Sequence, residues 1–206
     1  KVTLVELADA ILPAEDAAVS AHAKQAFQKR GMDVRTSASV KDFDLGENAI
    51  GCTIVAGASE ERISFDYVVA AVGVQGNVEH LGLDKLGVKT DRGFIVIDEF
   101  GRTNVTGIYA IGDVAGPPCL AHKSSHEGVI CVEKLAGLDN VQPLDRNRIP
   151  ACTYGRPQVA SVGLSELAAK KAGHRVRIGR FDLAANGKAL AIGEGDGFVK
   201  TVFDAE

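Results

Sequence analysis

The sequence predicts an α/β protein, and three patterns carry that prediction. Segments 67–73 and 107–112 are apolar on both faces, as interior strands of a covered sheet are. Segments 13–31 and 121–136 repeat apolar residues at helical spacing and end at glycine or just before one. Between them, the short alternating runs of residues 33–65 predict a β-meander. Buried strands followed by amphipathic helices indicate an open sheet covered by helices.

Composition excludes several classes of function. The chain has 206 residues, 46% of them hydrophobic, and a net charge of −4, so no basic surface for nucleic acid is expected. No apolar run approaches the ~18 residues of a membrane span, and no signal peptide is expected. The cysteines show neither Cys-x-x-Cys spacing nor a metal-ligand grouping, so we expect free thiols in a reducing cytoplasm and no metal site. They are Cys52, Cys119, Cys131 and Cys152.

The stretch 103–127, TNVTGIYAIGDVAGPPCLAHKSSHE, combines three features of a ligand site. A predicted strand ends at Asp113, whose carboxylate can accept hydrogen bonds from a polyol. Gly112 beside it lets a ligand approach the backbone. A helix that begins near Ala121 directs free N–H groups to the same place. Glu127 is expected on the solvent-facing side of this helix. A bare strand–turn–helix would share only part of this pattern.

This stretch resembles the second flavin-binding motif of the pyridine nucleotide–disulfide oxidoreductases. Its Ala-His-Lys triplet, residues 121–123, resembles the triplet found at this place in the dihydrolipoyl dehydrogenase branch of that family. The resemblance implies that Asp113 holds the ribityl chain of FAD. It also implies that four residues lie along the flavin ring: Cys119, Leu120, Ala121 and His122. Cys119 stands where that branch commonly has methionine.

The same resemblance implies an NAD site. Glu6 ends an apolar run, where an acid binds the adenosine ribose and favours NAD over NADP. Val40 matches a wall residue beside the adenine, although a plain strand core residue would look alike. Gly73 matches a glycine that lets the backbone pass close to NAD. The following Val74–Asn77 departs from the branch's usual Arg-Arg-Pro-Asn.

The implied fold class is α/β, with FAD/NAD(P)-binding Rossmann-like three-layer domains and a β-meander, followed by part of an α+β dimerisation domain. We expect residues 1–76 to be the later half of an NAD-binding domain, and 77–148 the second segment of an FAD-binding domain. Residues 149–206 would be the first part of the dimerisation domain, with a helix over 166–172 and strands over 175–181 and 197–203.

The implied parent is a cytoplasmic homodimer that oxidises dihydrolipoamide on the acyltransferase core of a 2-oxoacid dehydrogenase complex, passing electrons through a redox disulfide and FAD to NAD. The Cys-x4-Cys pair, the glycine-rich phosphate turns and the terminal His–Glu base are not in this chain. We therefore expect no catalytic residue here, and no turnover by these 206 residues alone. Other possibilities are another member of the family, a non-catalytic dimerisation fragment, or a nucleotide-binding regulator without redox activity.

Overall fold

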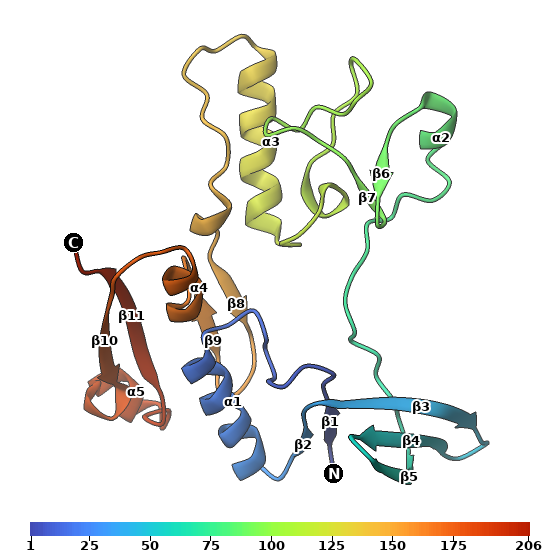
Figure 1. Cartoon of the computed structure of the whole chain (residues 1–206), viewed down its shortest axis with the longest axis vertical. Coiled ribbons are helices and arrows are strands. Elements are labelled where there is room, and N and C mark those ends of the chain that lie inside the picture. Colours follow the sequence, from blue (N-terminus) through green and yellow to red (C-terminus); the bar gives the residue numbers. More distant parts are fainter. The chain divides into compact units, whose positions relative to one another are not determined.

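The computed structural model describes all 206 residues, which form two compact units (Figure 1). One unit contains residues 1–70 and 152–206, and the other contains residues 71–151. The first holds β1 (Thr3–Val5), α1 (Ala17–Lys29), β2 (Asp33–Arg35), β3 (Ala38–Leu45), β4 (Ile50–Ala56), β5 (Ser59–Phe65), most of β8 (Ala151–Thr153), β9 (Val159–Ser161), α4 (Glu166–Lys171), β10 (Val176–Asp182), η3 (Leu183–Ala185), α5 (Gly187–Ala191) and β11 (Phe198–Asp204). The second holds α2 (Leu83–Leu86), β6 (Thr90–Asp91), β7 (Phe94–Ile95), η1 (Gly112–Ala115), α3 (Ala121–Leu135) and η2 (Arg146–Arg148).

The first unit begins with a β–α–β arrangement. Strands β1 and β2 pair in parallel, with Leu4 opposite Val34, and α1 connects them. The helix buries Ala23 in a cluster that includes Val34. It begins about one turn later than the sequence predicted, because Asp16 is its N-cap and not a residue of its first turn. It ends before Gly31, which has a left-handed φ of 86°.

The β-meander is confirmed for β3, β4 and β5, which are antiparallel neighbours. The inward residues of β4, Cys52 and Ile54, are each 2% exposed. The segment predicted as the first strand of the meander pairs with β1 instead and is β2. Its Val34 is apolar enough to serve in either sheet, so local alternation alone could not assign its partner.

The two segments predicted as buried strands are not strands in this chain. Residues 67–73 have no ladder partner, and Tyr67 and Val72 are 87% and 97% exposed. In segment 107–112 the strand-like pairing is limited to one bridge, between Arg102 and Tyr109. An apolar run becomes an interior strand only when neighbouring strands satisfy its N–H and C=O groups, and the chain supplies no such neighbours here.

Residues 159–206 form a small α+β arrangement. Strands β10 and β11 make an antiparallel hairpin with Val176 opposite Asp204, which confirms the two predicted strands. Helix α4 confirms the predicted helix, and its cap is Ser165, whose hydroxyl accepts a hydrogen bond from the N–H of Ala168 at 3.2 Å. The sequence pattern was sufficient here because the strands are neighbours in the chain.

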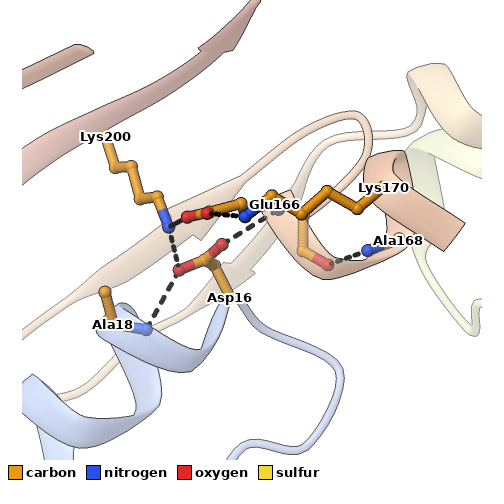
Figure 2. Close-up of polar contacts among 7 residues, drawn as sticks. Asp16, Ala18, Glu166, Ala168, Lys170 and Lys200 are labelled. Carbon is orange, nitrogen blue, oxygen red and sulfur yellow. Dashed lines mark hydrogen bonds and ion pairs between the residues drawn. The ribbon is translucent and has the colours of Figure 1, made fainter. Parts of the chain in front are cut away.

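A cluster of ions joins α1 to α4 and β11 within the first unit (Figure 2). The ammonium of Lys200 donates to Asp16 at 2.8 Å and to Glu166 at 2.7 Å. Asp16 also accepts the N–H groups of Ala18 at 3.0 Å and Glu166 at 3.1 Å, so one carboxylate caps both helices. Burial opposes the charge of Asp16, but the hydrogen bonds from Lys200 and the two amides outweigh it and lower its pKa.

Candidate functional site

The predicted ligand site is a short turn followed by a helix, both in the second unit. Asp113 lies in the 3₁₀ turn η1 rather than at a strand end. Its side chain is exposed and has no partner among the hydrogen bonds and ion pairs of the chain. Turn η1 contacts α3, the helix that carries His122. The unpartnered carboxylate of Asp113 thus lies in a turn that contacts α3, and the sequence predicts that both elements bind one ligand.

The N-terminus of α3 has no side-chain cap. Its capping residue is Leu120, whose side chain cannot accept a hydrogen bond, so the N–H groups of the first turn stay free. Ala121 and His122 are exposed, and Cys119 is half-buried. The imidazole Nε2 of His122 lies 2.8 Å from the carbonyl oxygen of Pro150, so its ring is engaged by the chain and its backbone N–H is left for a ligand.

Two charged residues of α3 bind the backbone of turn η1, and neither was predicted as part of the site. Lys123 is 1% exposed, and its ammonium donates to the carbonyl oxygens of Gly112 at 2.9 Å and Gly116 at 2.7 Å. Glu127 accepts the N–H of Gly112 at 2.7 Å and lies 3.3 Å from Lys123. The expectation that Glu127 faces water was wrong: its side chain is 12% exposed. The i,i+4 spacing of the two residues was the available signal.

A side chain at Gly112 would be strained and would require Ser124 to move. The φ of Gly112 is +78°, in the left-handed region, and a Cβ there would lie 2.8 Å from the hydroxyl oxygen of Ser124. A shallow, mainly apolar groove of about 530 Å³ lies beside this point, lined in part by Ile111, Ser124 and Val129. This apolar groove thus lies along α3, next to the turn that carries Asp113.

The structure distributes the predicted NAD residues over both units. Glu6 follows β1, is half-buried, and accepts the N–H of Ala8 at 2.8 Å through one carboxylate oxygen. Val40 lies in β3 opposite Ile54 and is half-buried. Gly73 belongs to the second unit, is exposed and has a φ of +131°. Its conformation is one that only glycine adopts readily.

The remaining chemistry-bearing side chains form no second centre. All four cysteines are free, and burial, followed by the negative charge of Asp98, raises the pKa of Cys131. No group of three or more histidine, cysteine or acidic residues lies together to hold a metal. A helix with the length and apolar character of a membrane span does not occur. The turn at Asp113 is thus the best-defined candidate site.

Comparison with protein families identifies the relationship. The model described as "Pyridine nucleotide-disulphide oxidoreductase" matches residues 1–128, and the model of that family's dimerisation domain matches residues 149–206. The chain belongs to the pyridine nucleotide–disulphide oxidoreductase family. The fold is accordingly that family's α/β nucleotide-binding fold followed by part of the dimerisation domain, as predicted. The α+β hairpin and helices of residues 159–206 lie in the part matched as dimerisation domain.

Similar proteins support the same family. The chain is 55% identical to a dihydrolipoyl dehydrogenase of Rhizobium etli over 98% of its length, and 54% identical to one of Zymomonas mobilis over all of it. It spans only 42% and 44% of those relatives. The solved structure of LpdA from Mycobacterium tuberculosis is 26% identical and has a TM-score of 0.86, covering 99% of this chain and 44% of that one. These comparisons show the family and the fold of the chain. Because the chain covers less than half of each relative, they do not show its activity.

Proposed function

We propose that the chain is part of a flavin-dependent dihydrolipoyl dehydrogenase, which oxidises protein-bound dihydrolipoamide with NAD. The observation that carries the proposal is the identity of 54–55%, over essentially the whole chain, to relatives of that name. The unpartnered carboxylate of Asp113, beside the uncapped N-terminus of α3, supports it. The redox disulfide would come from residues outside this chain, because its cysteines lack the required spacing.

The exposed carboxylate and the free N–H groups support FAD as the ligand of this turn. Asp113 would accept hydrogen bonds from the ribityl hydroxyls, since its carboxylate has no competing donor in the chain. The free N–H groups of α3 would stabilise negative charge on the pyrimidine edge of the flavin, an effect worth about 0.3–1 kcal/mol at an exposed helix terminus. The stretch from Cys119 to His122 would lie along that edge. When bound, FAD supplies the electron transfer between the disulfide and NAD.

The NAD site would include Glu6, Val40 and Gly73. One oxygen of Glu6 is already used by the N–H of Ala8, which fixes the carboxylate and leaves the second oxygen for a ribose hydroxyl. A carboxylate at this point disfavours the 2′-phosphate of NADP through like-charge repulsion. The half-buried Val40 would offer an apolar surface to the adenine, and Gly73 a backbone without a Cβ.

The partners are proposed on the same basis. The dimerisation-domain match of residues 149–206 supports a homodimer. The natural substrate would be the lipoyl group on the acyltransferase core of a 2-oxoacid dehydrogenase complex. Four free cysteines fit a reducing compartment, and we place the protein in the cytoplasm.

The test uses the full-length protein. We expect it to be purified with a flavin absorbance band and to form NADH from dihydrolipoamide and NAD. Asp113→Ala should lose most of its flavin while keeping its far-UV circular dichroism. Reduction of glutathione disulfide with NADPH, in place of dihydrolipoamide oxidation, would assign the protein to another branch of the family and overturn the proposal. The 206-residue chain alone should not turn over even with added FAD.

A further inference from the structure

The most completely buried charge in the chain lies directly beneath the candidate flavin site. Lys123 is 1% exposed as a residue, and its side chain is fully covered. A buried ammonium is unfavourable unless all three of its donors find partners. Here the ammonium donates hydrogen bonds to the carbonyl oxygens of Gly112 and Gly116, and it forms an ion pair with the carboxylate of Glu127 at 3.3 Å. A lysine in this position needs a reason stronger than packing, because an apolar residue would fill the space at lower cost.

The partners of Lys123 flank the residue that the proposed function assigns to FAD. Gly112 and Gly116 stand at the two ends of turn η1, and Asp113 lies between them. Both glycines have positive φ values, +78° and +102°. Because glycine lacks a Cβ, its backbone is the least restricted, and the turn needs other contacts to hold its conformation. The ammonium ties both of their carbonyl groups to one point on α3. Glu127 adds a third tie by accepting the N–H of Gly112 at 2.7 Å.

The side chain of Asp113 contributes nothing to its own placement. It makes no hydrogen bond or ion pair within the chain, so its direction follows from the turn that carries it. The free N–H groups that would face the same ligand belong to the first turn of α3, which also carries Lys123. Lys123, with Glu127 beside it, therefore ties the two elements of the site together.

We propose that Lys123 is a positioning residue for FAD: it locks the turn Gly112–Gly116 against α3, so that Asp113 and the helix N-terminus address the same cofactor. This inference rests on the proposed function. The charge of Glu127 balances that of Lys123, so the pair acts through geometry more than through a net field at the flavin. A lysine that only stabilised the fold would affect FAD and NAD binding alike, and this difference makes the inference testable.

The experiment uses the full-length protein, stripped of flavin and titrated with FAD by fluorescence quenching. Lys123→Met should weaken FAD binding by about 10- to 100-fold, the size of effect expected when a binding group is displaced by about 1 Å. The KM for NAD at saturating FAD should change by less than about twofold, a threshold set well below that effect. The matched control is Lys134→Met in the last turn of α3, where the ammonium lies over the Phe100 ring, and FAD binding should stay at the wild-type value.

A second variant keeps the inference falsifiable if Lys123→Met does not fold. Glu127→Gln preserves an acceptor for the N–H of Gly112 but removes the charge that balances Lys123. We expect it to weaken FAD binding by about 3- to 10-fold with an unchanged KM for NAD, a smaller loss because both carbonyl ties remain. An unchanged FAD affinity in whichever variant folds, or parallel losses for FAD and NAD, would overturn the positioning role.

The failure of this inference can be told apart from failure of the proposed function. If Asp113→Ala loses FAD while the variants at Lys123 and Glu127 bind it normally, only the positioning role is wrong. If the wild-type full-length protein binds no FAD, both are overturned. Visible circular dichroism of the bound flavin gives an independent readout, because a displaced turn changes the asymmetric surroundings of the ring even where affinity is recovered at high FAD.

Discussion

The carboxylate of Asp16 offers a quantitative test of the contacts in Figure 2. It caps α1 through the N–H of Ala18 at 3.0 Å and α4 through the N–H of Glu166 at 3.1 Å, and its side chain is 14% exposed. Asp16→Ala removes both caps with one substitution. Loss of one N-cap typically costs about 1 kcal/mol, so the two together should lower the free energy of unfolding by about 2 kcal/mol. Lys200 still retains Glu166 as a partner, which limits any further loss.

The matched control is a residue that caps a single helix. Ser165→Ala removes only the hydrogen bond to the N–H of Ala168 and should cost about 1 kcal/mol. Both variants are compared with the wild-type chain by urea denaturation, followed by far-UV circular dichroism at neutral pH. The reasoning is refuted if Asp16→Ala lies within about 0.5 kcal/mol of Ser165→Ala, because the second cap would then contribute nothing measurable.

Three further predictions concern pH, backbone and thiols. Because the pKa of Asp16 is lowered on folding, its contribution is complete above the ordinary carboxyl pKa and is lost as pH falls through the folded value; the stability difference between wild type and Asp16→Asn should shrink below about pH 4 in urea titrations, and a constant difference would contradict this. Gly112→Ala should weaken FAD binding of the full-length protein more than Gly107→Ala, since both have left-handed φ values but only the first meets a side chain; equal titration curves would argue against the steric account. A maleimide at pH 7 should label exposed Cys152 well before Cys131, whose pKa burial raises, as peptide mass spectrometry would detect; the reverse order would be inconsistent with the structure.

Local signals in the sequence were sufficient wherever an element is completed by its neighbours in the chain. The meander β3–β5 and the hairpin β10–β11 connect adjacent strands, and alternation with turn residues predicted both. Helix α3 was predicted from its apolar spacing and the residues that precede it. The predicted site residue Asp113 is exposed in the turn before that helix, although the turn is a 3₁₀ turn and not the predicted strand end.

The predictions that failed depended on partners that are distant in sequence or not present. Segment 67–73 has the composition of an interior strand, but a strand also needs neighbours, and pattern alone cannot say whether the chain provides them. Lys123 and Glu127 were missed for another reason. The i,i+4 spacing indicates an ion pair, but a charged pair on a helix usually faces water, and the spacing does not show that a turn covers this pair.

The contacts of Asp16 with Glu166 and Lys200 also have a consequence for folding during translation. Asp16 finds its amide partner 150 residues later and its ammonium partner 184 residues later. Helix α1 is therefore translated well before Glu166 and Lys200, and its contact with Lys200 cannot form until β11 has been translated. A pause or truncation in translation before β11 would therefore leave the contacts between α1 and Lys200 unformed.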